Sequence, residues 1–169
     1  MPTEVIQVPS HIVDPLAKKV IGKDISWVYC PTIIDENIPF DGHTFQFAHV
    51  LYGGYEPQSD LCMPLLYDFL LWFQPLALIR AKLNLTTRSE QIHEGGYHTD
   101  ITDAVGSKYK TAVLYLNDCD GYTKFLDTGE KVQSKKGRMV CFDGKREHTG
   151  SNTTDAQARF VLNLNYIPK

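Results

Sequence analysis

The sequence predicts a mainly β protein, a jelly-roll barrel with supporting N-terminal helices. The second half of the chain holds eight short strand-like runs with turns between them, the spacing of a two-sheet barrel. The first 75 residues carry two helical patterns that can cover such a barrel. The 169 residues are 43% hydrophobic and 22% charged, as in one globular domain. We therefore expect a single domain, with residues 1–75 as support and 76–169 as the barrel.

The N-terminal part alternates between strand and helix patterns. Residues 4–8 alternate apolar and polar side chains and predict a short strand. Residues 10–22 repeat apolar positions at a period near 3.6, from a capping serine to a terminal glycine, and predict a helix. Two strand-like runs, 25–33 and 44–52, precede a strongly apolar helix over residues 59–73, with its first serine as the cap.

From residue 76 onward the pattern changes to closely spaced strands, and no further helix is predicted. The expected strands lie at about 77–86, 94–101, 110–117, 122–126, 130–135, 138–143, 147–152 and 157–167. Strands far apart in such a sequence become neighbours when the two sheets form. Side chains from distant segments can therefore meet inside the barrel.

Composition and charge indicate a protein of a reducing compartment. The four cysteines are scattered without a close pair, so we expect reduced thiols, no zinc site and a cytoplasmic protein. The N-terminus lacks a secretory signal pattern, and the apolar stretch 61–79 contains Asp68 and two prolines, which favours a buried helix and strand over a membrane span. The net charge is −3, yet residues 79–169 are basic, which keeps an acidic partner open.

One motif has the pattern of a metal site. His98 and Asp100 form a His-x-Asp step after two glycines, and His148 follows fifty residues later. Two imidazoles and a carboxylate leave about three positions open on an octahedral ion, the arrangement of non-haem Fe(II) oxygenases. The alternatives are a surface His–Asp hydrogen bond and a loop histidine. We interpret His49 as a packed or hydrogen-bonded sheet residue and His93 as a loop residue.

Three further polar residues fall within predicted strands. Arg159 begins the last strand, and a guanidinium facing an apolar interior requires an anion, which a dicarboxylate can supply through two charge-assisted hydrogen bonds. Tyr115 can donate its hydroxyl to the same carboxylate, and Asn84 is a weaker third candidate. The alternatives are a surface ion pair of Arg159 with Asp155 or Asp143, and a core position for Tyr115.

From about residue 78 to its end the chain resembles the Fe(II)/2-oxoglutarate-dependent dioxygenases, in particular the prolyl-4-hydroxylase-like branch and its small phage-type members. The resemblance rests on several short motifs in order, namely Tyr97-His98-Thr99-Asp100, Ala112-Val113-Leu114-Tyr115-Leu116-Asn117, Gly121-Tyr122-Thr123-Lys124-Phe125, Lys136-Gly137-Arg138-Met139-Val140-Cys141-Phe142, Glu147-His148-Thr149-Gly150 and Ala158-Arg159-Phe160. Residues 1–75 match no functional motif of this family.

The resemblance implies a double-stranded β-helix, the jelly roll of this family. It implies Fe(II) at His98, Asp100 and His148, and 2-oxoglutarate at Arg159 and Tyr115, with Asn84 as a further co-substrate contact. It also implies O₂ as the oxidant, ascorbate as a stimulating reductant and, for a phage-encoded member, the host cytoplasm. Halogenation is disfavoured because the family's halogenases lack the carboxylate that Asp100 supplies.

The implied reaction is hydroxylation of a C–H bond with release of succinate and CO₂. The resemblance favours a prolyl or other side chain of a peptide, protein or amino acid. An oxygenase acting on a nucleic acid base and a non-catalytic jelly-roll binding module are the alternatives. The expected substrate side is the barrel mouth at loops 53–60, 87–97 and 101–109, which offer Tyr55, Arg88, Tyr97, Lys108 and Tyr109. The sequence does not predict the oligomeric state.

Overall fold

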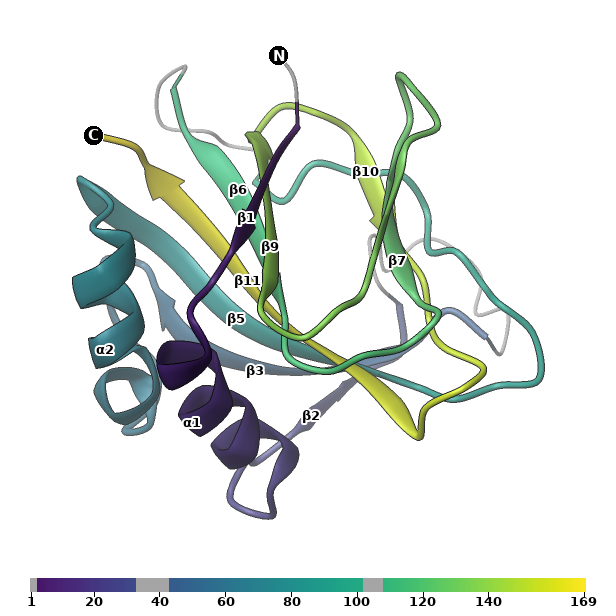
Figure 1. The fold of residues 1–169 in the computed structure, drawn as a ribbon, viewed down its shortest axis with the longest axis horizontal. Helices are drawn as coiled ribbons and strands as arrows, with labels where there is room; N and C mark the ends of the chain where they lie inside the picture. The colour runs from purple at the N-terminus through teal and green to yellow at the C-terminus, as the bar shows by residue number, and fades with distance from the viewer. Residues whose placement is uncertain (1–2, 33–42, 102–107) are drawn as a thin grey trace.

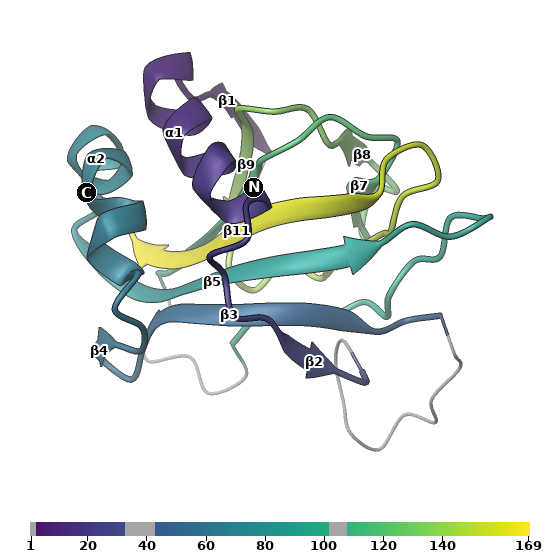
Figure 2. The same ribbon diagram turned by 90° about the horizontal axis from the view of Figure 1, so that it is seen from below.

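The computed structural model describes residues 3–32, 43–101 and 108–169. Two antiparallel sheets face each other, one of eight strands and one of three, and two helices lie on the far side of the larger sheet (Figures 1 and 2). The larger sheet has the strand order β1-β9-β6-β11-β5-β3-β2, with β4 paired to β3, and the smaller sheet has the order β10-β7-β8. This arrangement confirms the mainly β jelly-roll prediction.

The larger sheet draws its strands from the whole chain. They are β1 (Glu4–Gln7), β2 (Val28–Cys30), β3 (Gln46–Gly53), β4 (Glu56–Pro57), β5 (Ala77–Thr87), β6 (Lys110–Tyr115), β9 (Arg138–Asp143) and β11 (Ala158–Ile167). The smaller sheet consists of β7 (Tyr122–Phe125), β8 (Lys131–Gln133) and β10 (His148–Gly150). The long strands β5 and β11 pair along their whole length at the centre of the larger sheet.

The two helices pack on the larger sheet through apolar faces. Helix α1 (Ser10–Ile21) buries side chains that recur every three to four residues, at Val13, Leu16, Ala17 and Val20. Helix α2 (Cys62–Phe73) is apolar over most of its surface and ends at Gln74, whose φ of 50° closes the last turn. Neither helix of the described chain is long and apolar enough to cross a membrane.

Side chains on the two faces of the larger sheet enter two separate cores. Leu162 and Leu164 of β11 belong to the core under the helices. Val161, on the same strand, belongs to a second core between the two sheets, together with Tyr115 and Phe125. Successive strand residues point to opposite faces, so β11 contributes to both. The face toward the smaller sheet also carries the polar side chains that form the site below.

The structure corrects three of the predicted elements. Residues 94–101 form no continuous strand, and their backbone pairs through isolated bridges at Glu94 and His98. Helix α2 begins at Cys62, and the Ser59 hydroxyl accepts a hydrogen bond from the Leu61 N–H and lies 2.8 Å from the His49 Nε2 instead of capping a helix at its own position. The strand expected at 25–33 is limited to Val28–Cys30 among the described residues.

The other predicted strands agree with the structure apart from one or two residues at their ends, and both helices lie where the pattern placed them. The interpretation of His49 as a sheet residue is confirmed. Its ring nitrogens lie 2.8 Å from the Ser26 carbonyl oxygen and 2.8 Å from the Ser59 hydroxyl. These contacts tie β3 to the segments on either side of it.

Asp120 fixes the turn that precedes β11. It accepts hydrogen bonds from the Thr153 hydroxyl at 2.8 Å and from the Thr154 N–H at 2.8 Å, and it contacts the Thr154 hydroxyl. Burial alone would raise the pKa of Asp120, but the hydrogen bonds from Thr154 outweigh it and lower the pKa to about 2 from an ordinary 3.8. The pKa of Asp120 is lower in the folded than in the unfolded protein. The ionised carboxylate therefore contributes its full stabilisation of the fold above pH 4, and this contribution is lost as the pH falls toward 2.

We expect the substitution Asp120→Asn to lower the free energy of unfolding at pH 7 by about 1 kcal/mol, a value reduced for solvent screening at this partly exposed site. The difference from the unsubstituted protein should shrink as the pH falls from 4 toward 2. Urea unfolding at pH 7 and at pH 3 measures both values. A difference that is the same at the two pH values would contradict this role of the carboxylate.

Candidate metal centre

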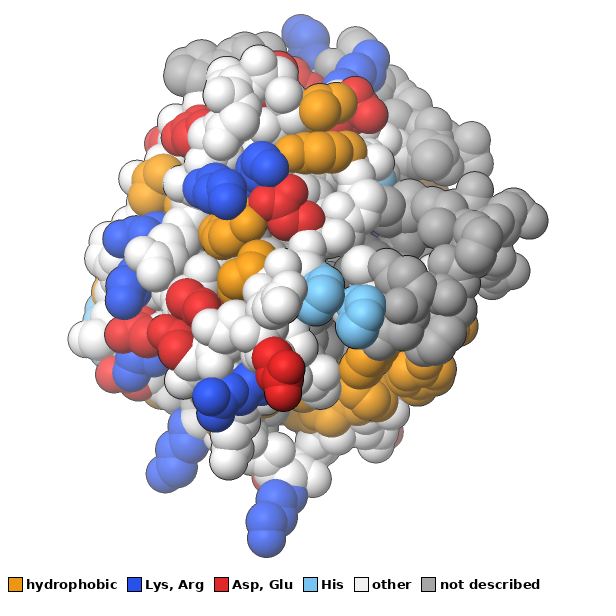
Figure 3. Space-filling model, turned by 90° about the vertical axis from the view of Figure 1, so that its right-hand side faces the viewer, with side chains coloured by type: hydrophobic (Ala, Val, Ile, Leu, Met, Phe, Trp, Pro, Cys, Tyr) orange, Lys and Arg blue, Asp and Glu red, His pale blue; other side chains and the backbone are white. Residues whose placement is uncertain are grey.

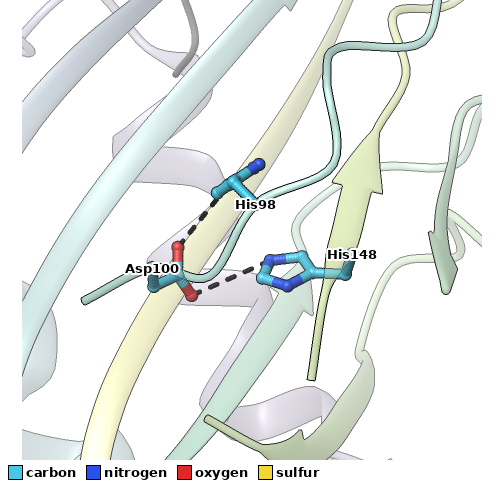
Figure 4. Close-up of side chains that lie close together, drawn as sticks. All are labelled: His98, Asp100 and His148. Carbon is cyan, nitrogen blue, oxygen red and sulfur yellow. Dashed lines mark ion pairs between the residues drawn. The ribbon is translucent and has the colours of Figure 1, made fainter. Parts of the chain in front are cut away.

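A backbone bridge brings the two halves of the motif together. The His98 N–H donates to the His148 carbonyl at 3.0 Å, and the His148 N–H donates to the His98 carbonyl at 3.0 Å. Residues fifty positions apart therefore lie directly opposite each other. Asp100, two residues beyond His98, points back toward both rings (Figure 4).

The three side chains present their donor atoms to one point. His98, Asp100 and His148 each offer one donor atom, and these atoms lie within 4.8 Å of one another. The His98 Nε2 is 4.0 Å from Asp100 Oδ1, and the His148 Nε2 is 3.8 Å from Asp100 Oδ2 (Figure 4). Metal–ligand bonds of about 2.1 Å require donor atoms roughly 3–4 Å apart. The two distances to Asp100 fall at the upper end of that range, so a small inward movement of the side chains would bring all three donors onto one first-row metal ion.

Each imidazole is oriented by a backbone carbonyl. The His98 Nδ1 lies 3.0 Å from the Gly96 carbonyl oxygen, and the His148 Nδ1 lies 3.2 Å from the Arg146 carbonyl oxygen. An Nδ1–H donated to these oxygens leaves the Nε2 lone pair directed at the common point, as in metal-binding histidines generally. Burial lowers the pKa of His148, although the nearby Asp100 offsets part of that effect. The His148 ring is therefore neutral at pH 7, the form that binds metals.

Asp100 is held by three donors besides the histidines. Its Oδ1 accepts from the Asn163 amide at 3.1 Å and forms an ion pair with Arg80 at 3.0 Å, and its Oδ2 accepts from the Asn165 amide at 3.2 Å. Burial alone would raise the pKa of Asp100, but attraction to His148 in its protonated form and to the Arg80 guanidinium outweighs burial, and the pKa is lowered. The carboxylate is therefore ionised and fixed in place.

We expect the substitution Asn163→Leu to weaken Ni(II) binding by about 10- to 100-fold, because outer partners of a ligating carboxylate typically contribute that much. Calorimetric titration of the metal-free protein with Ni(II) measures the change. The melting temperature without metal should be recorded alongside, since a fold-wide loss would lower it as well. Unchanged affinity would show that Asn163 does not position Asp100.

The segment that carries His98 is anchored to the smaller sheet by charge. On the side of the molecule where the smaller sheet lies, acidic and basic side chains are neighbours (Figure 3). Glu94 accepts hydrogen bonds from Lys124 at 2.8 Å and from the Tyr122 hydroxyl at 2.6 Å. Its backbone also pairs with Ser151. These contacts, four residues before His98, hold the segment without a continuous strand.

A buried arginine faces the same cavity. Arg159 is 5% exposed, and its guanidinium donates to the Ser151 carbonyl and the Thr123 hydroxyl, both at 3.3 Å. Its Nε has no hydrogen-bond partner, and no described carboxylate forms an ion pair with it. Gly121 makes room for the side chain, since a Cβ there would stand 2.6 Å from the Arg159 Cδ. A buried cation without an anion is unfavourable, so the site fits a ligand with a carboxylate.

A cavity of about 70 Å³ lies between the two sheets and is partly open to solvent. Side chains of both sheets line it, and among them are all three members of the His98, Asp100 and His148 group and Arg159. The metal-binding group and the buried guanidinium therefore face one shared space.

Comparisons with known proteins agree with this arrangement. No protein-family model and no curated protein matches the sequence. Solved structures do match, among them a Pseudomonas putida prolyl-4-hydroxylase, with a TM-score of 0.63 and 17% identity over 99% of this chain and 92% of that one. The viral collagen prolyl hydroxylase of Paramecium Bursaria Chlorella virus-1, in complex with 2-oxoglutarate, has a TM-score of 0.59 and 16% identity over 100% and 97%.

A third match is HygX from Streptomyces hygroscopicus with nickel and 2-oxoglutarate bound, at a TM-score of 0.62 and 13% identity over 99% of this chain and 83% of that one. The chain has the fold of the 2-oxoglutarate and Fe(II) oxygenases. Within that oxygenase fold, the three metal-capable residues that the sequence predicts lie together, and Arg159 faces the cavity beside them.

Tyr115 and Asn84, the two weaker candidates for a co-substrate contact, have different surroundings. Tyr115 is fully buried, and its hydroxyl donates to the Val132 carbonyl at 2.9 Å. Burial raises the pKa of Tyr115, and the charge of the neighbouring Arg159 offsets part of that rise. Asn84 lines the cavity, and its Oδ1 is buried without a partner. Asn84 is therefore open to a ligand, whereas the Tyr115 proton is already donated.

The expected mouth residues do not line the cavity. Tyr109 is buried, and its hydroxyl donates to the Gly144 carbonyl at 2.8 Å, so its predicted role in substrate contact is wrong. Tyr55 is exposed at the β3–β4 turn. His93 stacks on the His43 ring with centroids 4.3 Å apart, outside the metal-binding group. Part of the loop 101–109, residues 102–107, lies outside the described residues.

Sequence reasoning missed several polar residues of the cavity. Gln46 on β3, Lys82 on β5, Thr123 on β7 and Asn163 on β11 line it, and Arg80 on β5 and Asn165 on β11 contact Asp100 at its edge. A signal for some of them was present, because Arg80, Lys82 and Asn84 alternate along β5 and therefore point to one face. The same alternation joins Arg159 to the two asparagines of β11. Alternation along β5 and β11 therefore predicts that the polar residues of each strand share one face of the sheet.

Proposed function

We propose that this chain is an Fe(II)- and 2-oxoglutarate-dependent dioxygenase that hydroxylates a C–H bond. Under this proposal His98, Asp100 and His148 hold the metal, and Arg159 holds the distal carboxylate of 2-oxoglutarate, with Asn84 and Tyr115 beside it. The observation that carries the proposal is the buried Arg159 without an anion in the cavity that also contains the three metal-capable side chains. Neither feature is explained by a structural role.

The bound metal and co-substrate would supply the oxidising chemistry, with O₂ consumed and succinate and CO₂ released. The chain contributes position and charge. The two carbonyl-oriented imidazoles and the fixed Asp100 would hold the metal at the wall of the cavity that all three side chains line. The two sheets enclose this space and limit the access of water. Arg159 orients the co-substrate by pairing with the end that lies away from the metal.

The proposed substrate is a prolyl or other side chain of a peptide, protein or amino acid. Support comes from the matched structures, since two are prolyl hydroxylases and another, from Trichoplax adhaerens, is a prolyl hydroxylase in complex with a hypoxia inducible factor peptide fragment. The structures matched also include HygX with hygromycin B bound. The substrate type therefore varies within this fold, and it has to be tested directly.

The deciding experiment measures succinate release by the Fe(II)-loaded protein with 2-oxoglutarate. A panel of proline-containing peptides, free amino acids and oligonucleotides should be added one at a time, with ascorbate present throughout. We expect stimulation by a peptide or an amino acid. Stimulation by an oligonucleotide would favour the nucleic acid alternative. No turnover together with no retention of iron would favour a non-catalytic binding module.

A further inference from the structure

The cavity carries more positive than negative side chains. Three cations face it or border it, Arg80, Lys82 and Arg159, and Asp100 is the one carboxylate that the described residues place there. Asp100 forms an ion pair with Arg80 at 3.0 Å. Lys82 and Arg159 have no carboxylate partner among the described residues. Two positive charges in the cavity are therefore without a counter-charge.

Binding of the proposed metal and co-substrate does not remove this excess. A divalent cation brings two positive charges and a dicarboxylate brings two negative charges, so together they leave the balance as it was. Arg159 would pair with one end of the dicarboxylate, and the other end would lie on the metal. Lys82 then still lacks an anion of its own, and a partly buried ammonium without one is unfavourable.

The strand register places Lys82 and Arg159 at opposite ends of the cavity. Thr86 pairs with Arg159 across β5 and β11, whereas Lys82 pairs with Asn163. Four residues of strand separate the two positions, about 13 Å along the sheet. The carbon chain of 2-oxoglutarate, with four carbon–carbon bonds of about 1.5 Å, spans at most about 6 Å. These positions assign 2-oxoglutarate to Arg159 at one end of this span, and they leave Lys82, opposite Asn163 and near Asp100, for a separate anion.

The surroundings of the two cations also differ. Arg159 extends to Ser151 and Thr123 at the smaller sheet and is 5% exposed. Lys82 lies among Arg80, Asp100 and Cys30, and its neighbour across β3, Val50, is 41% exposed. Lys82 thus stands at the open end, beside the metal-binding group, where a second reactant would enter.

We propose that the substrate carries a carboxylate, which binds Lys82 at the open end of the cavity. This inference rests on the proposed oxygenase function and narrows its substrate to an acid. The carboxylate is either the α-carboxylate of a free amino acid or an acidic side chain next to the target residue of a peptide. Lys82 is a specificity-determining residue in this scheme, and Arg80 keeps the surrounding field positive while it holds Asp100.

The test uses the full chain loaded with Ni(II) and 2-oxoglutarate, and loading is measured first by calorimetry. Matched probes are then titrated: L-proline against L-prolinamide, and proline-containing peptides with Glu against the same peptides with Gln beside the proline. We expect the acid of at least one pair to bind roughly tenfold tighter or more than its neutral partner. The pair that shows the preference identifies the source of the carboxylate.

Substitution of Lys82 tests whether that residue produces the preference. Lys82→Met should reduce the ratio of acid to neutral affinity by roughly tenfold, and Lys82→Arg should retain most of it. Lys23→Met removes an exposed charge away from the cavity and should not change the ratio. Should Lys82→Met fold poorly, Lys82→Gln removes the same charge with a polar side chain, and it should reduce the ratio of acid to neutral affinity in the same way.

The outcomes separate the two proposals. If Ni(II) and 2-oxoglutarate do not bind, the proposed function fails. If both bind but no acid is preferred, or no acid binds at all, the inference about Lys82 is overturned and the proposed function stands. It is also overturned if Lys82→Met weakens 2-oxoglutarate binding while the acid preference survives, because Lys82 would then serve the co-substrate.

Discussion

Replacement of His98 by alanine is expected to abolish the metal site. His98 supplies one of three donor atoms that lie within 4.8 Å of one another, and His148 and Asp100 alone offer two. Loss of an outer partner of a metal ligand already weakens binding about 10- to 100-fold, so loss of a ligand should exceed that range. Anaerobic Fe(II) and 2-oxoglutarate should give a visible charge-transfer absorption with the unsubstituted protein and none with His98→Ala.

The matched control is His11→Ala, which removes an exposed imidazole from α1 on the far side of the larger sheet. It should retain both the metal affinity and the absorption. Circular dichroism should show that His98→Ala keeps its β structure, since His98 joins β10 by backbone rather than side-chain hydrogen bonds. Full metal affinity in the folded His98→Ala protein would remove His98 from the ligand set.

Replacement of Arg159 by methionine is expected to have effects of opposite sign on stability and on co-substrate binding. Without a ligand, the guanidinium is buried, its Nε lacks a partner, and no carboxylate of residues 3–32, 43–101 and 108–169 forms an ion pair with it. An apolar side chain of similar length avoids that unfavourable charge. The melting temperature of the ligand-free protein should therefore stay the same or rise.

The same substitution should weaken 2-oxoglutarate binding by about 2–5 kcal/mol, because it removes one partner of a buried, hydrogen-bonded charge pair. Thermal shift with and without 2-oxoglutarate in the presence of Ni(II) measures both effects on one sample. Arg88→Met serves as the control, since Arg88 is an exposed arginine at the end of β5. Undiminished stabilisation of Arg159→Met by 2-oxoglutarate would refute the assignment of Arg159.

Local patterns were sufficient to predict much of the fold. The period of Val13, Leu16 and Val20 identified α1, and alternation identified the long strands β5 and β11. The segment 94–101 was assigned as a strand because its sequence is compatible with an extended backbone. Among the described residues its backbone lies beside the three-residue strand β10 and Ser151 just after it, and two isolated bridges form there. Whether an extended segment becomes a strand therefore depends on the length of the strand beside it as well as on its own sequence.

The residues of the candidate site that could be predicted are those whose own sequence segment contains a recognisable motif. The His-x-Asp step and His148 were visible in the sequence, and so was a lone arginine in an apolar strand. Arg80 was not identified, because its contact with Asp100 depends on how β5 and β11 are paired. The hydrogen bond from the Tyr115 hydroxyl to the Val132 carbonyl could not be predicted, because nothing in the sequence around Tyr115 indicates that Val132 lies beside it.

Because β11 has apolar side chains on one face and polar side chains on the other, it tolerates some kinds of mutation less than others. Leu162 and Leu164 belong to the core under the helices, while Arg159, Asn163 and Asn165 serve the opposite side. A slip of one residue in its pairing would exchange these two sets in a single step. An insertion or deletion within β11 should therefore prevent folding, so its effect on the site cannot be measured separately. Substitutions in α2, by contrast, lie on the other side of the larger sheet from the site.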